Sequence, residues 1–158
     1  MAKIERKLMA HFIDAATTGT PNYVRLGDDL EEYSVEMSAN VETKRNILGE
    51  TITTIDGYEK SGTVEPYMAD SGTELFERLQ GIIDGELTLD DLKTSVVEVH
   101  LWEAAQSGNF TAYKEDAVIE VTSYGGDTTG YQIPFNVHYK GGRVKGTFDP
   151  KTKTFTAD

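Results

Sequence analysis

Apolar and polar residues alternate along most of the chain, which is the pattern of half-buried β-strands. The alternation is clearest from Tyr131 to Tyr139, where every second residue is aromatic or β-branched, and it is also regular from Tyr33 to Ala39. Turn-forming residues separate the runs. The pattern predicts about seven to nine short strands, placed within residues 7–14, 23–26, 33–39, 58–67, 94–103, 113–124, 131–139, 143–148 and 153–156.

One segment has the spacing of an amphipathic helix instead. Ser71 and Glu74 stand three residues apart, as in a capping box, and Gly85 supplies a stop. We therefore expect one α-helix at about residues 71–84, lying on a sheet. Its packing face is an apolar stripe made of Leu75, Phe76, Leu79, Ile82 and Ile83.

Three segments fit neither pattern simply. Residues 40–56 are charged and poor in core candidates, which predicts a long loop, and loops of this length in compact domains are usually functional. Residues 1–7 are charged and predict a mobile arm. The pair Gly141-Gly142 predicts a tight turn, followed by a C-terminal hairpin over residues 143–158.

These elements define a mainly-β class, a β-sandwich or barrel with one flanking helix. At 158 residues, with no internal repeat and no linker, the chain is expected to form a single domain, 1–158. It has no cysteine, which excludes disulfides and thiolate metal sites. It has no apolar run long enough to span a bilayer and no apolar stretch after its charged start. We expect no membrane partner and no signal peptide.

The charge is strongly and unevenly negative. The net charge is −12, with 17 acidic against 4 basic residues from Leu26 to Leu92, whereas residues 138–153 hold five basic residues against Asp149 alone. Such a protein is a poor sequence-independent binder of nucleic acid, because that binding depends on Lys and Arg. Either the charge only confers solubility, or an acidic surface repels an anion or pairs with a basic patch on a neighbour.

Candidate chemistry is sparse. The three histidines, at positions 11, 100 and 138, are far apart in sequence, and the sequence motifs of zinc proteases, serine hydrolases and phosphate-binding loops are absent. Acidic pairs such as Asp90-Asp91 and Glu115-Asp116 are typical of solvated loops. We expect no catalytic residue, no metal site and no cofactor.

Four stretches of the chain carry a resemblance to a known family: Asn40–Glu50, Gly57-Tyr58, Thr63–Tyr67 and the helix start Ser71–Phe76. Together with the order of strands, charged segment and helix, they resemble the major tail protein of long-tailed phages, the subunit of the tail tube. The same fold occurs in tubes of contractile tails and of bacteriocin-like particles, so the resemblance leaves the subfamily open. It implies an α+β tail-tube fold.

The resemblance also implies function and partners. Hexameric rings would stack into a hollow tube through which DNA passes, in a virion tail assembled in the host bacterial cytoplasm. Partners would be further copies of the chain, the tape measure, the tail terminator, the distal tail or baseplate proteins, and genomic DNA in passing. The long loop would reach a neighbouring subunit or ring through Glu42, Lys44, Arg45, Asn46, Ile47, Leu48 and Glu50.

Charge suggests two further surfaces. An acidic lumen would repel DNA phosphates, which are spaced about 1.7 Å apart along the duplex axis. Salt would screen this repulsion within about 10 Å. Opposite charge would also help to set the register between subunits. The candidates for the lumen are Asp28, Asp29, Glu31 and Glu32, and those for a basic interface are Arg143, Lys145, Lys151 and Lys153.

Two alternatives remain open at this stage. The first is a monomeric β-sandwich module that binds a carbohydrate or protein ligand. The second is a hydrolase that uses loop carboxylates. The size of the protein in solution separates a tube subunit from a monomeric module.

Overall fold

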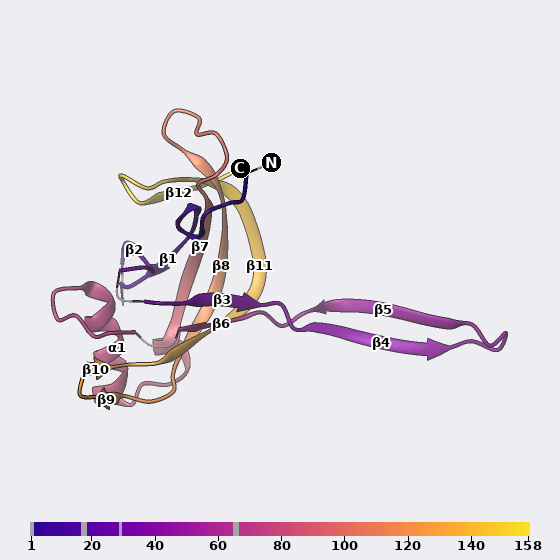
Figure 1. The fold of residues 1–158 in the computed structure, drawn as a ribbon, viewed down its shortest axis with the longest axis horizontal. Coiled ribbons are helices and arrows are strands. Elements are labelled where there is room, and N and C mark those ends of the chain that lie inside the picture. Colours follow the sequence, from indigo (N-terminus) through magenta and orange to yellow (C-terminus); the bar gives the residue numbers. More distant parts are fainter. Residues whose placement is uncertain (1, 17–18, 29, 65–66) are drawn as a thin grey trace.

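A computed structural model describes residues 2–16, 19–28, 30–64 and 67–158 of the chain. Within them the protein is mainly β, with one α-helix beside a curled antiparallel sheet (Figure 1). The fold class expected from the sequence is confirmed.

Seven antiparallel strands cross the sheet as far as the described residues show it, and β12 (Thr154–Ala157) pairs with the end of one of them. Two separate strand pairs lie outside it: β4 (Ala39–Arg45) with β5 (Thr51–Tyr58), and β9 (Gly125–Asp127) with β10 (Gly130–Gln132). Short 3₁₀ turns lie at Arg6–Leu8 and Leu89–Leu92. The order across the main sheet is β2 (Tyr23–Arg25), β1 (Met9–Asp14), β7 (Lys93–His100), β8 (Phe110–Val121), β11 (Phe135–Asp149), β6 (Ser61–Val64) and β3 (Tyr33–Glu36).

Strand β11 runs through the position where a tight turn was expected. Gly141 and Gly142 have φ angles of 89° and 71°, and the register with β8 shifts there. The predicted turn is wrong, because the positive φ that suits a turn equally suits a bulge within a strand. On its other edge β11 pairs with β6 as far as His138 and with β12 from Gly146. No described strand covers that edge between them.

Helix α1 (Glu74–Gly85) starts later than the capping-box spacing indicated. Its N-cap is Thr73, whose Oγ1 accepts a hydrogen bond from the backbone N–H of Phe76 at 3.3 Å. Ser71 does not have this role. The helix ends because Glu86 adopts a left-handed conformation with φ of 46°, so the residue after Gly85 supplies the stop.

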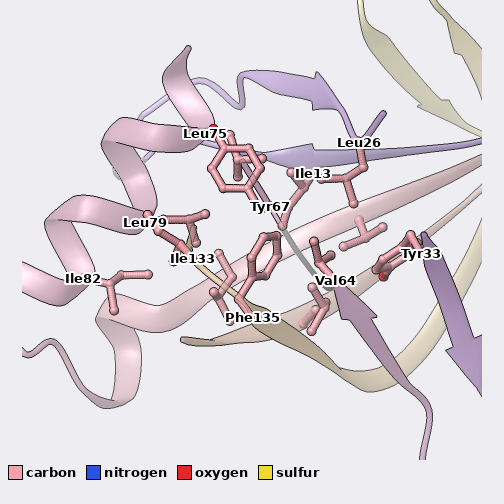
Figure 2. Packing of buried hydrophobic residues seen from close by; sticks show 14 residues of the cluster. Ile13, Leu26, Tyr33, Val64, Tyr67, Leu75, Leu79, Ile82, Ile133 and Phe135 are labelled. Atoms are coloured by element: carbon pink, nitrogen blue, oxygen red, sulfur yellow. The ribbon is translucent and has the colours of Figure 1, made fainter. Parts of the chain in front are cut away.

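The predicted apolar stripe of the helix lies on the main core cluster (Figure 2). Leu75, Leu79 and Ile82 are buried, while Phe76 and Ile83 are half-buried at its margin. Each buried aliphatic side chain contributes about 1.5–3 kcal/mol. The helix therefore covers one half of this face of the sheet. Its partners beneath include Ile13, Val64, Tyr67, Val96, Ile119, Ile133, Phe135 and Val137.

Arg78 is buried although it lies outside the predicted apolar stripe of the helix. Its guanidinium donates hydrogen bonds to the backbone carbonyls of Ala16 at 2.6 Å, Asp91 at 3.3 Å and Lys93 at 2.7 Å. Arg78 therefore links α1 to the start of β7 and to the segment after β1.

The segment expected as a long loop is a β-hairpin. The β4–β5 pair begins beyond the sheet in the register of the β3–β6 pair, since Glu36 opposes Ser61 and Ala39 opposes Tyr58, and its register shifts by one residue between Ala39 and Val41. The hairpin projects away from the body (Figure 1). The loop prediction is wrong because residues 51–55 are Thr and Ile, whose strand preference outweighs the polarity of the segment.

Candidate functional site

One face of the sheet changes from apolar to polar along several neighbouring strands. The apolar part packs under α1, and the polar part reaches the root of the hairpin, where Glu98 and Glu115 line the same cavity as Tyr58. A side-chain step of two residues keeps the same face of a strand. The change runs from Ile13 to His11 on β1, from Val96 to Glu98 on β7, from Ala117 to Glu115 on β8 and from Val137 to Tyr139 on β11.

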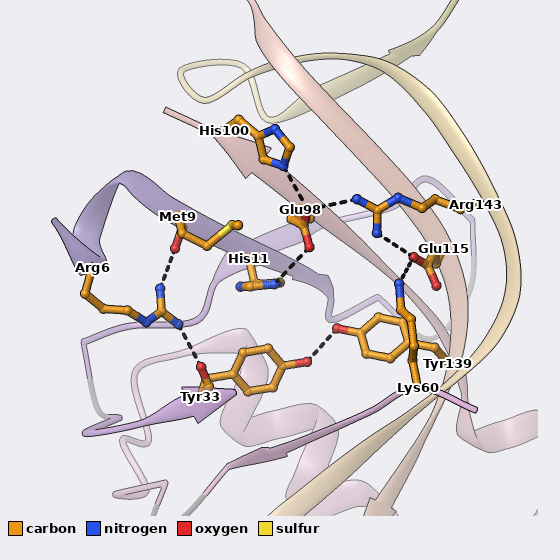
Figure 3. A network of polar contacts seen from close by, with 10 residues as sticks. All are labelled: Arg6, Met9, His11, Tyr33, Lys60, Glu98, His100, Glu115, Tyr139 and Arg143. Atoms are coloured by element: carbon orange, nitrogen blue, oxygen red, sulfur yellow. Dashed lines mark hydrogen bonds and ion pairs between the residues drawn. The ribbon is translucent and has the colours of Figure 1, made fainter. Parts of the chain in front are cut away.

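Two carboxylates from different strands are joined by one guanidinium in this polar part (Figure 3). Arg143 donates to Glu98 and to Glu115, each at 2.9 Å. Lys60 makes a further ion pair with Glu115, whose side chain is only 5% exposed. His100 lies 2.8 Å from the other carboxylate, Glu98. The bulge at Gly141-Gly142 immediately precedes Arg143 and sets its position.

His11 lies beside this network, and neither nitrogen of its ring has a hydrogen-bond partner among the described residues. The residue is 6% exposed, its ring meets Tyr33 edge-on at 4.9 Å, and its Nε2 is 3.7 Å from Glu98, longer than a hydrogen bond. The Tyr33 and Tyr139 hydroxyls are 2.6 Å apart. The innermost part of the site therefore places the buried His11 ring next to the paired hydroxyls of Tyr33 and Tyr139.

Burial and pairing move the pKa values of this group in opposite directions. Burial alone raises the pKa of Glu98, but His11, His100 and Arg143 together lower that pKa below its usual range. Burial raises the pKa of Tyr33 to about 12 and raises the pKa of Tyr139 further. Glu98 is therefore held as an anion and the tyrosines as neutral hydroxyls near neutral pH.

Among the described residues, the polar network has the features neither of a catalytic acid nor of a metal site with several ligands. A catalytic acid needs a raised pKa, whereas Glu98 is shifted the other way. Two histidines meet at Glu98, but among the described residues no group of three or more side chains is arranged to hold a metal. His138 lies elsewhere on β11, paired with Glu120 at 2.7 Å.

An open cavity of about 790 Å³ lies between this network and the root of the hairpin. Its polar wall includes Glu98, Glu115 and Arg143, and its apolar wall includes Met37 and Tyr58. Both of these apolar side chains are 53% exposed. The part of the sheet face that α1 leaves uncovered therefore holds a cavity with a charged wall and an exposed apolar lip, which is formed by Met37 and Tyr58.

The hairpin carries the residues expected to contact another subunit. Every residue of β4 and β5 is exposed except Gly57, which is half-buried. Glu42 and Lys44 form an ion pair of 3.1 Å along β4, and Arg45 opposes Thr51. The remaining predicted residues, Asn46, Ile47, Leu48 and Glu50, form the turn at the tip.

The predicted lumen residues do not form a purely acidic patch. Asp28, Glu31 and Glu32 are exposed and line a second cavity of about 540 Å³, together with Arg6, Lys7 and Arg25. Asp29 lies outside the described residues. Arg6 also donates to the Tyr33 carbonyl at 2.9 Å, so the N-terminal segment expected as a mobile arm is attached to the body at this residue.

The four predicted basic residues are in two different environments. Lys145, Lys151 and Lys153 are exposed on β11 and on the turn before β12. Arg143 belongs to the polar network and already has two carboxylate partners within its own chain.

Sequence reasoning missed the polar network altogether. Glu98 and His100 follow Val96 on one face of a predicted strand, and this polar continuation of an apolar face was the available signal. Its partners Glu115 and Arg143 come from other strands, and only the strand register brings them together.

No family model matches this chain, and no curated protein matches it. Among the described residues, no helix is both long enough and apolar enough to cross a membrane. The fold and site therefore define a mainly-β protein with a projecting hairpin and an uncovered polar cavity at its root.

Proposed function

We propose that this protein is a structural subunit that assembles with copies of itself, as the tail-tube subunit of a long-tailed phage does. In this proposal hexameric rings stack into a hollow tube for DNA passage. The observation that carries it is the hairpin β4–β5, whose two strands bury no side chain against their own body.

A hairpin of this kind is unfavourable in a solitary molecule. Two strands without a covering layer are marginally stable in water, and their outer edges offer unpaired backbone groups. Large apolar side chains on it stay exposed: Val41, Ile47, Leu48, Ile52, Ile55 and Tyr58. A neighbouring copy that covers them would stabilise both the hairpin and the assembly.

Charge supports the same proposal more weakly. With a net charge of −12, the protein would repel DNA from most of its surface and let it slide through a channel. The exposed lysines Lys145, Lys151 and Lys153 would then meet acidic residues of a neighbouring copy.

The second candidate function is a monomeric binding module, and the cavity of about 790 Å³ favours it. Its volume lies within the range of about 300–1,000 Å³ of small-ligand sites. In this alternative the cavity holds a carbohydrate or a peptide, and the protein stays monomeric.

Electron microscopy of the concentrated protein, with sedimentation velocity on the same sample, separates the two candidates. A tube subunit gives rings or hollow tubes and a concentration-dependent increase in sedimentation coefficient. A uniform monomer at every concentration contradicts the assembly proposal and favours the binding module.

A further inference from the structure

The tip of the hairpin is built to hold two apolar side chains in solvent. Asn46 Oδ1 accepts hydrogen bonds from the backbone N–H groups of Leu48 and Glu50, both at 3.0 Å, and Gly49 has a φ of 81°. Ile47 is 100% exposed and Leu48 is 78% exposed. A turn ordered by its own hydrogen bonds loses little entropy on docking, so the tip is prepared for a partner.

The cavity at the hairpin root has the complementary character. Met37 and Tyr58 form an exposed apolar lip, and α1 leaves this half of the sheet face uncovered. The adjacent edge of β11 between Tyr139 and Lys145 is not paired with any described strand. The cavity could thus accept both apolar side chains and a short backbone segment.

Charge complements this fit. Arg6 lines the cavity and donates to the backbone carbonyls of Met9 and Tyr33, but among the described residues it has no ion pair with a carboxylate. Glu50 at the tip is exposed, and its carboxylate lies 3.5 Å from Asn46 within its own turn. A docked tip can bring this anion to the uncompensated cation.

The tip cannot fill the cavity of its own molecule. Strand β4 has seven residues and therefore holds the tip about 23 Å beyond the root. A second copy presents the same tip and the same cavity. Because these are two different patches, the contact repeats from copy to copy and generates a closed ring or an open stack.

We propose that the hairpin tip of one copy, with Ile47 and Leu48, docks in the root cavity of the next copy, with Glu50 approaching Arg6. This inference rests on the proposed function, because it identifies the contact through which the copies assemble.

Cysteine cross-linking tests it directly, since the natural chain contains no cysteine. Leu48→Cys combined with Met37→Cys should give a ladder of disulfide-linked oligomers after oxidation of assembled particles. The matched control is Leu48→Cys with Leu89→Cys, because Leu89 is 83% exposed but lies outside the cavity. This control should give no ladder beyond the dimers of the single Leu48→Cys variant.

The outcomes separate this inference from the proposed function. A ladder specific to the 48–37 pair supports it. Assembled particles without that ladder, or with an equal ladder for the 48–89 pair, overturn the docking site and leave the assembly proposal standing. A wild-type chain that never assembles overturns both.

Exchanged charges give a second readout. Glu50→Arg and Arg6→Glu should each raise the concentration needed for assembly by roughly tenfold, and the double variant should restore it to near the wild-type value. Thermal unfolding of each variant checks that it is folded. If folded single variants assemble as well as the wild type, or the folded double variant stays as impaired as the singles, Glu50 does not meet Arg6.

Discussion

Arg143 joins two carboxylates that come from different strands. Buried charges are tolerated when they are paired and hydrogen-bonded, and removal of one partner leaves the others uncompensated. Glu115 retains Lys60 if Arg143 is lost, but Glu98 retains only histidines. The guanidinium therefore contributes mainly by making the burial of both carboxylates possible.

We expect Arg143→Met to lower the free energy of unfolding by about 2 kcal/mol. This is less than for a fully buried pair, because the Arg143 side chain is 37% exposed and Lys60 remains on Glu115. Chemical denaturation at neutral pH measures the change. The exposed Lys145→Met is the control and should shift stability by no more than about 0.5 kcal/mol. Equal effects of the two substitutions would show that the network is not stabilising.

The lowered pKa of Glu98 makes part of the stability pH-dependent. A carboxylate whose pKa is lower in the folded than in the unfolded state stabilises the fold fully above its unfolded pKa of about 4.3, and this contribution is lost progressively as the pH falls from there toward the lower folded pKa. The difference in unfolding free energy between the wild type and Glu98→Gln should therefore narrow from pH 7 to pH 3. A constant difference across this range would contradict the assigned direction.

At the scale of elements, alternation predicted the strands and helical spacing predicted α1, because both depend on local periodicity. The predictions that failed concern either a pattern that fits two structures or contacts between residues that are far apart in the sequence. The pattern around Gly141-Gly142 fits a turn and a bulge equally. The polarity of residues 40–56 predicts a loop, and only the strand preference of its Thr and Ile residues indicates a hairpin. The network of Glu98, Glu115 and Arg143 requires the register of three strands, which no local pattern contains.

The cap of α1 gives a sharp test at this scale. Thr73→Ala should destabilise the protein by about 1 kcal/mol, because it removes the hydrogen bond to the Phe76 N–H and the Thr73 contact with the Tyr67 hydroxyl. Ser71→Ala should be nearly neutral. Thermal denaturation distinguishes them. A larger loss of stability for Ser71→Ala than for Thr73→Ala would indicate that Ser71 is the N-cap, as the sequence pattern predicted.

At the scale of the whole molecule, stability is divided between a covered body and an uncovered extension. The body has a core beneath α1, whereas the hairpin has only its own ladder. Segments of this kind open locally at low free energy and are ordered further by binding. Assembly would therefore change the hairpin most and the body least.

Limited trypsin digestion should reveal this difference. In the free subunit, cleavage should occur first after Lys44 or Arg45, which are exposed next to the tip. Assembled particles should be protected there by at least roughly tenfold in rate, because docking suppresses local opening. Mass spectrometry of the fragments locates the cuts. Identical cleavage rates in the two samples would mean that assembly leaves the hairpin uncovered.

The most direct measurement uses a clipped variant, in which residues 39–58 are replaced by Asn-Gly. Ser38 would then face Glu59 across a two-residue turn, in the register that already pairs Glu36 with Ser61 and in which the Glu59 N–H donates to the Ser38 carbonyl at 3.2 Å, so the body should fold unchanged. In sedimentation velocity at matched concentrations, we predict that the wild type assembles and the clipped variant remains a folded monomer. Assembly of the folded clipped variant to the same extent as the wild type would contradict the account.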